Sequence, residues 1–184
     1  MIIGITGTDG AGKGTVVDYL VSQLGFVHYS SRDLIMREVE KRGLEPNRIN
    51  ARIVGNALRA EFGPDVIVKK ALEQITKDGV EKAVIESIRA VKEAEALKQA
   101  GGILLAVDAP TEVRYERIVG RGSVTDQVSF IDFQKQEALE MDDPDPNGMQ
   151  KAKVMQMANQ IIFNDCTLLE LQAVVDQFLQ KYSK

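Results

Sequence analysis

Short apolar runs alternate along this chain with longer stretches in which apolar residues recur at every third or fourth position. Five of the runs are rich in Ile, Val or Leu, which is typical of strands buried on both faces of a parallel sheet. We predict these strands at Ile2–Thr6, Phe26–Tyr29, Ala83–Ile85, Ile103–Val107 and Gln160–Phe163.

The segments between the runs have the periodicity of amphipathic helices. Connections between parallel strands are right-handed crossovers, so strands that alternate with helices predict an α/β fold. We therefore expect a five-stranded parallel sheet with helices on both faces. The regular helices are predicted at Lys13–Leu24, Ala90–Ala100, Thr111–Val119 and Leu168–Tyr182.

Two stretches do not fit the simple alternation. Residues 31–77 are helical throughout, with breaks near Gly43–Pro46 and Gly63-Pro64. Residues 120–150 hold a Gly-rich turn, a helix from about Phe130 to Met141, and an acidic tract. We expect both stretches to lie above the carboxyl edge of the sheet, where ligands bind in open α/β folds.

The composition is that of an ordinary soluble protein. The length of 184 residues favours one domain over residues 1–184. The net charge of −4 argues against a surface built to bind nucleic acid. No run approaches the roughly 20 apolar residues of a membrane span, and the single cysteine, Cys166, fits a reducing compartment. We expect a cytoplasmic monomer or small homo-oligomer without nucleic-acid or membrane partners.

The segment Gly7–Thr15, which reads GTDGAGKGT, follows the first predicted strand and opens the first helix. That is the context of a phosphate-binding loop. Its glycines allow the backbone amides to face a ligand, and the helix N-terminus adds about half a positive charge. The alternative is a purely structural glycine-rich turn. The residues predicted to bind a nucleotide here are Gly7, Asp9, Gly10, Ala11, Gly12, Lys13, Gly14 and Thr15.

The loop departs from the common GxxxxGK[ST] pattern because Gly14 follows Lys13 and the hydroxyl of Thr15 comes one place later. The GKGT ending resembles adenylate kinase and its relatives, and GTDGAGK resembles thymidylate kinase. This resemblance implies a three-layer P-loop NTPase fold that uses ATP and Mg²⁺. It implies that Lys13 contacts the β- and γ-phosphates and that Thr15 reaches the metal ion directly or through water.

Residues after the second strand resemble the acceptor site of nucleoside-monophosphate kinases, in which a Thr-Gly-Asp-x-x-Arg segment and a later Arg hold the acceptor phosphate. The resemblance implies that Ser31, Asp33, Arg37 and Arg89 bind the substrate. Arg32 stands where that family has Gly, and Arg37 lies one residue later than its Arg. The alternative is that Asp33 caps a helix and the arginines are solvated.

Glu86 closes the third predicted strand, where P-loop proteins place a carboxylate near the water shell of magnesium. The usual residue is Asp, and Glu reaches about one methylene further. The resemblance therefore implies a metal site made by Glu86 and Thr15, and the alternative is a surface carboxylate at a strand end.

Arg114, Arg117 and Arg121 fall at i, i+3 and i+7 of one predicted helix. Arginine offsets the charge of a phosphoryl group in transfer. In adenylate-kinase-like and dephospho-CoA-kinase-like proteins an Arg-rich helix followed by a mobile lid has this role. The resemblance implies catalytic roles for Arg117 and Arg121, a lid at about 120–150 and an acceptor-binding insertion at 31–77. The alternative is a solvated basic face.

The resemblance runs from residue 1 to about 182 and is closest to dephospho-CoA-kinase-like archaeal ATPases. Val107–Arg114 resembles the fourth-strand segment of that group. Ala158–Asp165 resembles its Ala-Asp-x-x-Ile-x-Asn segment near the adenine, with Asn159 in place of Asp. This implies that Asn164 lies at the nucleotide.

Three other features carry no predicted chemistry. His28 is expected in the core or at its rim rather than as a base. The tract 143–148 begins like a calcium loop, but its twelfth position is Val154 instead of Glu, so we expect an acidic turn. Arg48, Arg52 and Arg59 share a helix face and either line the acceptor pocket or face solvent.

Two functions remain open. The first is ATP- and magnesium-dependent phosphoryl transfer to a small nucleotide-like acceptor, either a nucleoside monophosphate or a dephospho-CoA type of molecule. A hydroxyl acceptor would need a general base, for which Asp33 is the candidate. The second is an ATPase switch without a small-molecule acceptor. The residues with predicted catalytic roles are Lys13, Asp33, Arg89, Arg117 and Arg121.

Overall fold

The computed structural model describes residues 1–121, 128–145 and 148–182. Its centre is a five-stranded sheet in the order β2-β3-β1-β4-β5, in which every neighbouring pair is parallel. The predicted parallel sheet is confirmed, and each strand lies within about one residue of its expected range. The strands are β1 (Ile2–Gly7), β2 (Val27–Ser30), β3 (Ala83–Glu86), β4 (Ile103–Asp108) and β5 (Gln160–Phe163).

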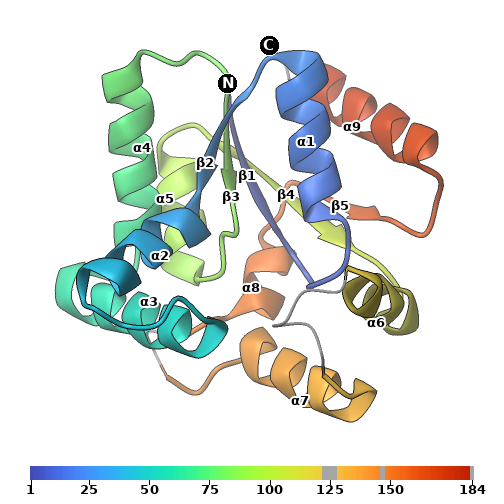
Figure 1. Cartoon of the computed structure of the whole chain (residues 1–184). Helices are drawn as coiled ribbons and strands as arrows, with labels where there is room; N and C mark the ends of the chain where they lie inside the picture. The colour runs from blue at the N-terminus through green and yellow to red at the C-terminus, as the bar shows by residue number, and fades with distance from the viewer. Residues whose placement is uncertain (122–127, 146–147, 183–184) are drawn as a thin grey trace.

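Helices cover both faces of this sheet, as Figure 1 shows. One face packs against α1 (Lys13–Leu24) and α9 (Leu168–Tyr182). The other packs against α4 (Val66–Asp78), α5 (Val91–Gln99) and α8 (Lys151–Gln156). The sheet therefore forms the middle layer of three, which is the fold class that the sequence predicts.

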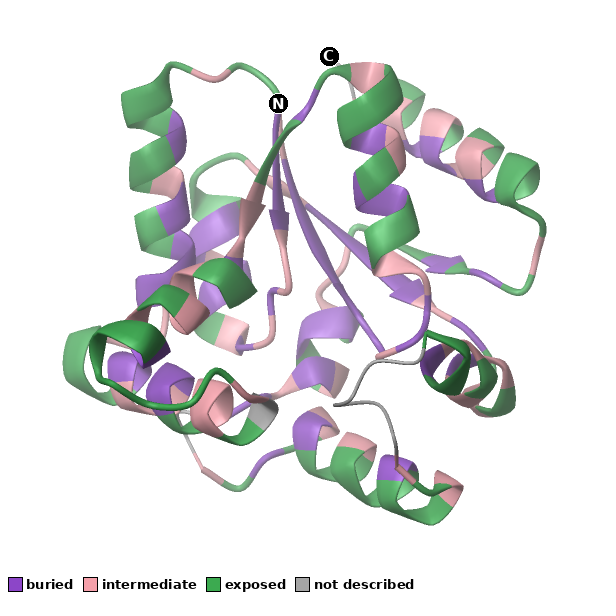
Figure 2. Ribbon diagram, viewed as in Figure 1, coloured by how far each residue is buried: buried purple, intermediate pink, exposed green. Residues whose placement is uncertain are grey.

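The inner strands β1, β3 and β4 are buried because both of their faces are covered, and they are largely purple in Figure 2. The edge strands β2 and β5 are more exposed than the sequence predicts, with Val27 and Phe163 among their exposed side chains. In β1, Ile3 and Ile5 pack beneath α1 and α9. Gly4 faces the other layer, where a Cβ would lie 2.3 Å from the side chain of Ile88. Alternate residues of β1 thus pack into the two hydrophobic cores on opposite faces of the sheet, because successive side chains of a strand point to opposite faces.

The remaining helices lie at the carboxyl end of the strands, at the bottom of Figure 1. They are α2 (Ser31–Lys41), α3 (Arg48–Phe62), α6 (Thr111–Gly120) and α7 (Phe130–Met141). The predicted insertion at 31–77 contains α2, α3 and α4, but α4 covers the sheet as an ordinary crossover helix. Only α2 and α3 are thus free to cover a ligand at the strand ends.

The short helix α8 is absent from the predicted elements because six residues are too few to display a periodic pattern. In the described part of the chain, no helix has the length and apolar character needed to cross a membrane. The predicted lid at about 120–150 includes residues 122–127 and 146–147, which lie outside the described residues.

Candidate functional site

The loop between β1 and α1 has a backbone that only glycine adopts without strain. Gly7, Gly10 and Gly12 have positive φ values of 127°, 82° and 95°. A Cβ on Gly7 would lie 1.9 Å from the carbonyl oxygen of Val107, and one on Gly12 would lie 2.3 Å from Asn164 Nδ2. The neighbouring segments therefore fix the path of the loop. Gly14 differs, because it is helical and nothing lies within 4 Å of its Cβ position.

Helix α1 begins directly after this loop without a capping side chain. Gly12 is its N-cap residue, and no side chain accepts a hydrogen bond from the first turn. The free amide groups and the positive end of the helix dipole are consequently directed at the loop. This arrangement attracts an anion of the size of a phosphate group.

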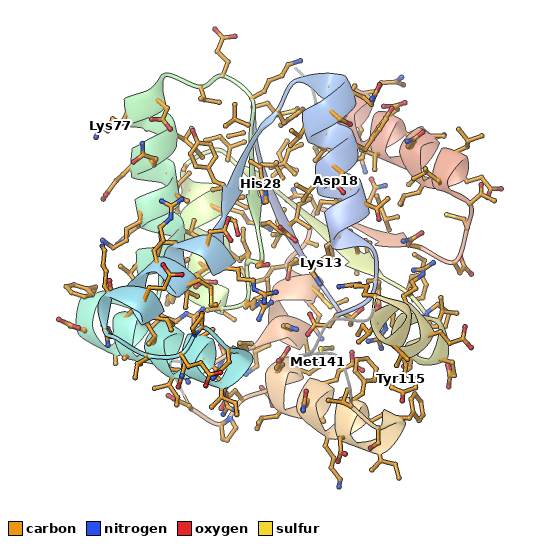
Figure 3. The ribbon with its side chains drawn as sticks, in the orientation of Figure 1. Lys13, Asp18, His28, Lys77, Tyr115 and Met141 are labelled. Atoms are coloured by element: carbon orange, nitrogen blue, oxygen red, sulfur yellow. The ribbon has the colours of Figure 1, made fainter. Side chains whose placement is uncertain are left out.

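Lys13 lies inside the loop, between α1 and α8 (Figure 3). Its ammonium donates hydrogen bonds to the carbonyl oxygens of Gly7 (3.1 Å) and Thr8 (2.6 Å), and it is 3.5 Å from the carboxylate of Asp9. Burial lowers the pKa of Lys13 to about 8 against the opposing charge of Asp9, and nearby Lys151 and Arg89 lower it further. A bound anion would restore the charge on this amine.

Two side chains brace the loop from β4 and from the segment after β5. Thr8 Oγ1 donates to Asp108 Oδ1 at 2.6 Å. Asn164 Nδ2 donates to the carbonyl oxygen of Ala11 at 2.7 Å and is buried there. Asn164, expected at the nucleotide, thus lies at the loop and holds its backbone.

A cavity of about 310 Å³ opens beside the loop. One guanidinium nitrogen of Arg117, NH1, is buried and has no hydrogen-bond partner among the described residues. A buried unsatisfied donor costs about 1–3 kcal/mol, so its presence points to a ligand that completes it. The cavity is lined by Gly10, Gly12, Thr15, Arg117, Arg121, Asn164, Cys166, Leu168 and Leu171.

Arg114 and Arg117 of α6 and Arg121, which directly follows this helix, do not form one solvated face. Arg114 is 4% exposed, and its guanidinium donates to the carbonyl oxygen of Ala109 at 2.7 Å and to the carboxylate of Glu137 on α7. It also lies over the ring of Phe133. Arg114 therefore binds α6 to α7, whereas Arg117 and the exposed Arg121 line the cavity.

Three of the predicted acceptor residues, Ser31, Asp33 and Arg37, lie on α2, which begins directly after β2. Ser30 caps α2 by accepting a hydrogen bond from the amide of Asp33 at 3.1 Å. The Asp33 carboxylate is exposed in the first turn, so the residue does not itself cap the helix. Ser31 is 4% exposed and its Oγ has no partner among the described residues, whereas Arg37 is exposed.

Glu86, at the end of β3, forms a 3.1 Å ion pair with Nε2 of His28 on β2. The hydrogen bond between them lowers the pKa of Glu86 and raises the pKa of His28. The charges of Lys13 and Arg89 also lower the pKa of Glu86, and that of Asp33 raises the pKa of His28. The His28 side chain is one-third exposed and belongs to none of the core clusters of the described residues, so it lies at the surface beside Glu86 and outside the core.

Ser87 follows Glu86 and is the only non-glycine residue with a positive φ in the described part of the chain, at 70°. Such strain persists only where the surroundings impose it. Here the next amide, that of Ile88, donates to the carbonyl oxygen of Ile5, and Thr6 Oγ1 donates to the carbonyl oxygen of Ile88. These bonds turn the chain after β3 and fix the position of Arg89.

Arg89 is held by the buried carboxylate of Glu93. Glu93 Oε2 accepts the backbone amide of Arg89 at 2.9 Å, and its Oε1 forms an ion pair with Arg59 of α3, also at 2.9 Å. The guanidinium of Arg89 stays close enough to Lys13 to lower the pKa of Lys13. The structure therefore brings Lys13, Glu86 and Arg89 together from three segments.

Two arginines of α3, Arg52 and Arg59, are also paired. Arg59 meets Glu93, and Arg52 lies 3.3 Å from the buried carboxylate of Asp143 in the acidic tract. Neither side chain belongs to a purely solvated face. The tract 143–148, predicted as an acidic turn, contacts α3 through Asp143 and Asp145, and its residues 146–147 lie outside the described residues.

Lys151 was missed by the sequence analysis. It opens α8 and is 3% exposed, and its ammonium donates to Asp9 Oδ1 at 3.1 Å and to Glu140 of α7. No sequence signal marks it, because a lysine in a short helix is usually solvated. Only the packing of α8 near β1 brings this amine to the loop.

Within the described residues, no cluster of three or more His, Cys, Asp or Glu side chains is placed to hold a metal ion. Thr15 is exposed at the cavity, and Glu86 is half-buried at the end of β3. Magnesium bound to a nucleotide needs few protein ligands, because phosphates and waters supply most of its oxygens. A hydroxyl and a carboxylate beside a phosphate loop fit this requirement.

A model of the AAA domain matches residues 3–140 of the chain. The UPF0200 protein of Pyrobaculum aerophilum is 32% identical over 92% of this chain and 90% of its own length. The UPF0200 protein of Methanosarcina acetivorans is 31% identical over 100% and 96%.

Solved structures share the fold at lower identity. TT1252 from Thermus thermophilus has a TM-score of 0.66 at 23% identity, covering 98% of this chain and 97% of its own. Shikimate kinase from Acinetobacter baumannii has a TM-score of 0.60 at 19% identity, covering 98% and 93%. Dephospho-CoA kinase from Campylobacter jejuni has a TM-score of 0.53 at 18% identity, covering 98% and 96%.

Proposed function

The chain belongs to the UPF0200 family and has the fold of the P-loop kinases, and from this premise we propose that it transfers a phosphoryl group from ATP to a small nucleotide-like acceptor. The observation that carries the proposal is the meeting of two half-sites at the carboxyl edge of the sheet. One is an anion-binding loop beside a cavity, and the other is the polar cluster at the ends of β2 and β3.

The donor half-site suits a nucleoside triphosphate. The loop amides and Lys13 bind the β- and γ-phosphates, and the cavity beside Gly12, Asn164 and Leu168 takes the remainder of the nucleotide. Arg117 NH1 gains a phosphate or base partner there, which removes the cost of leaving it buried and unpaired. Arg121 supplies a second guanidinium at the same cavity.

Thr15 and Glu86 are the residues that would hold magnesium, Thr15 from the donor side and Glu86 from the end of β3. The ion supplies positive charge at the β- and γ-phosphate oxygens. Glu86 is suited to this position because its pKa is already lowered by His28 and Lys13, so its carboxylate stays ionised.

The acceptor half-site consists of Ser31, Asp33, Arg37 and Arg89. Ser31 Oγ is buried and has no partner among the described residues, so it can donate to or accept from an acceptor, and Arg89 offers a charge that acts on Lys13. In the transfer, an acceptor oxygen bonds to the γ-phosphorus while the bond to the β,γ-bridging oxygen breaks and ADP leaves. With a phosphate acceptor no base is needed, and with a hydroxyl acceptor the proton passes to Asp33.

Binding and turnover measurements test the proposal in two steps. Calorimetry with MgATP should show binding to the wild-type chain and little or none to Lys13→Ala. Steady-state release of ADP should then increase when AMP, CMP, dTMP or dephospho-CoA is added one at a time. A chain that binds MgATP, but whose turnover no acceptor stimulates, would contradict the kinase function.

A nucleotide-dependent switch is the second candidate. It is favoured by the salt bridges that join the loop to α7, in which Arg114 and Lys151 bind Glu137 and Glu140. Through these bridges, a change in the loop on nucleotide hydrolysis would alter the position of α7. Turnover independent of any acceptor, with a change in protease sensitivity of α7 between MgATP and MgADP, would support the switch instead.

A further inference from the structure

Lys151 places a second buried ammonium group at the phosphate-binding loop. Its Nζ lies 3.1 Å from Asp9 Oδ1, and the Nζ of Lys13 lies 3.5 Å from the same oxygen. One carboxylate oxygen therefore bridges two lysines that are separated by most of the chain. Lys151 itself is 3% exposed.

Packing alone does not explain a charge at this position. Burying an ammonium group is costly even when it is paired, and a well-packed apolar residue is often as stable or more so. Helix α8 already buries Val154 and Met155 against its surroundings. The positive charges of Lys151 and Arg89 also lower the pKa of Lys13, so the ligand-free loop carries unfavourable like-charge interactions. A polyanion placed among these groups would reverse that cost.

The position of Lys151 relative to the two half-sites indicates which phosphate it can reach. The residues that line the cavity include neither Lys151 nor Lys13. Both ammonium groups contact Asp9 Oδ1, and the pKa of Lys13 also responds to the charges of Arg89 and Glu86. A phosphate oxygen in the place of Asp9 Oδ1 would therefore meet Lys13 and Lys151 together.

We propose that Lys151 is a second phosphate-binding lysine, which contacts the terminal phosphate of the bound triphosphate in the place that Asp9 Oδ1 takes in the ligand-free protein. The inference rests on the proposed nucleotide function and adds a residue to it. Glu140 is a positioning residue, because its hydrogen bond from Lys151 keeps the ammonium at the loop.

Calorimetry with two magnesium nucleotides tests this role. Lys151→Met should weaken MgATP binding by about tenfold or more and MgADP binding by less than about threefold, since only ATP carries the terminal phosphate. The matched control is Lys153→Met on the same helix, where the amine is 55% exposed and pairs with Asp142. This control should leave both affinities near the wild-type values.

A purely structural role for Lys151 gives a different result. The inference is overturned if Lys151→Met weakens the binding of MgATP and of MgADP equally. It is also overturned if the wild type binds MgATP and Lys151→Met weakens the binding of neither nucleotide. A wild-type chain that binds neither nucleotide overturns the proposed function as well, and the two failures are thereby distinguished.

The single variant removes a cation from between two carboxylates and can reduce folding. The double variant Lys151→Met/Glu140→Gln removes one charge of each sign and should unfold at a temperature close to that of Lys153→Met. This double variant should show the same selective loss of MgATP binding. The conservative variant Lys151→Arg, which keeps the positive charge, should retain much of the wild-type MgATP affinity. A folded double variant with wild-type MgATP affinity would contradict the proposed role of Lys151.

Discussion

Arg59 of α3 and Glu93 of α5 form an ion pair of 2.9 Å in which both side chains are almost completely buried. Glu93 also accepts the backbone amides of Arg89 and Ala90, so one carboxylate connects α3 to the segment that carries the predicted acceptor arginine. The acceptor side of the site thus depends on a charge pair inside the protein.

Removing one partner of this pair should destabilise the protein strongly. Arg59→Met leaves the Glu93 carboxylate buried with less compensation, and we expect a loss of about 3–5 kcal/mol in the free energy of unfolding. Urea denaturation measures this loss. Lys92→Met, which breaks the exposed pair with Glu95, is the control and should change stability far less, because water screens this pair. Equal effects from the two variants would contradict the prediction.

Arg117 and Arg114 should differ in what they contribute. Arg117→Met should weaken MgATP binding by about tenfold with little loss of stability, because NH1 has no partner in the described structure to lose. Arg114→Met should destabilise the fold by about 3 kcal/mol or more, because it leaves Glu137 without its guanidinium. Calorimetry and urea denaturation on both variants separate the two roles, and a destabilised Arg117→Met would argue against this assignment.

Two glycines of the loop should respond in opposite ways to alanine. Gly12→Ala requires a side chain at a φ of 95° and 2.3 Å from Asn164 Nδ2, so we expect a marked loss of stability and of MgATP binding. Gly14→Ala places its Cβ in open space on a helix and should stabilise the ligand-free protein by about 0.5–1 kcal/mol. Thermal unfolding of the ligand-free proteins tests both; a destabilised Gly14→Ala would show that this position is constrained.

Lys13 should make the stability of the ligand-free protein depend on pH. Its pKa is about 8 in the folded protein, against 10.5 for an ordinary lysine. Between these values the unfolded chain holds a proton that the folded chain has released, so the contribution of Lys13 to stability rises with pH. Relative to Lys13→Met, the wild type should gain about 3 kcal/mol from pH 8 to pH 10.5. Urea denaturation across this range measures it, and a constant difference between the two proteins would refute the lowered pKa.

Asp33 should reveal the chemistry of the acceptor. Asp33→Asn should slow transfer to a hydroxyl by roughly 10²–10⁴-fold, because a general base is lost. Transfer to a phosphate acceptor, which is already a nucleophile at neutral pH, should fall far less. Single-turnover rates with whichever acceptor stimulates ADP release measure the effect. Small losses with a confirmed hydroxyl acceptor would remove Asp33 from the role of base.

The strands and the glycine loop could be predicted because their signals are local. Short apolar runs such as Ile103–Val107 indicate strands covered on both faces, and a glycine-rich segment between a strand and a helix indicates the loop. The helical character of residues 31–77 could also be predicted from the sequence. The sequence could not show that α4 covers the sheet while α2 and α3 do not. That division depends on which apolar faces pack against the sheet, and those contacts join residues far apart in the chain.

The sequence by itself determined the order of strands and helices, the parallel sheet and the place of the loop, since each follows from residue periodicity and from the conformations open to glycine. The packing of distant segments sets the burial of Arg114 and brings Lys151 to Asp9, and it leaves one guanidinium nitrogen of Arg117 without a partner among the described residues. The physical reason is that the cost of burying a charge is set by the groups that packing brings to it, and those groups come from distant parts of the chain.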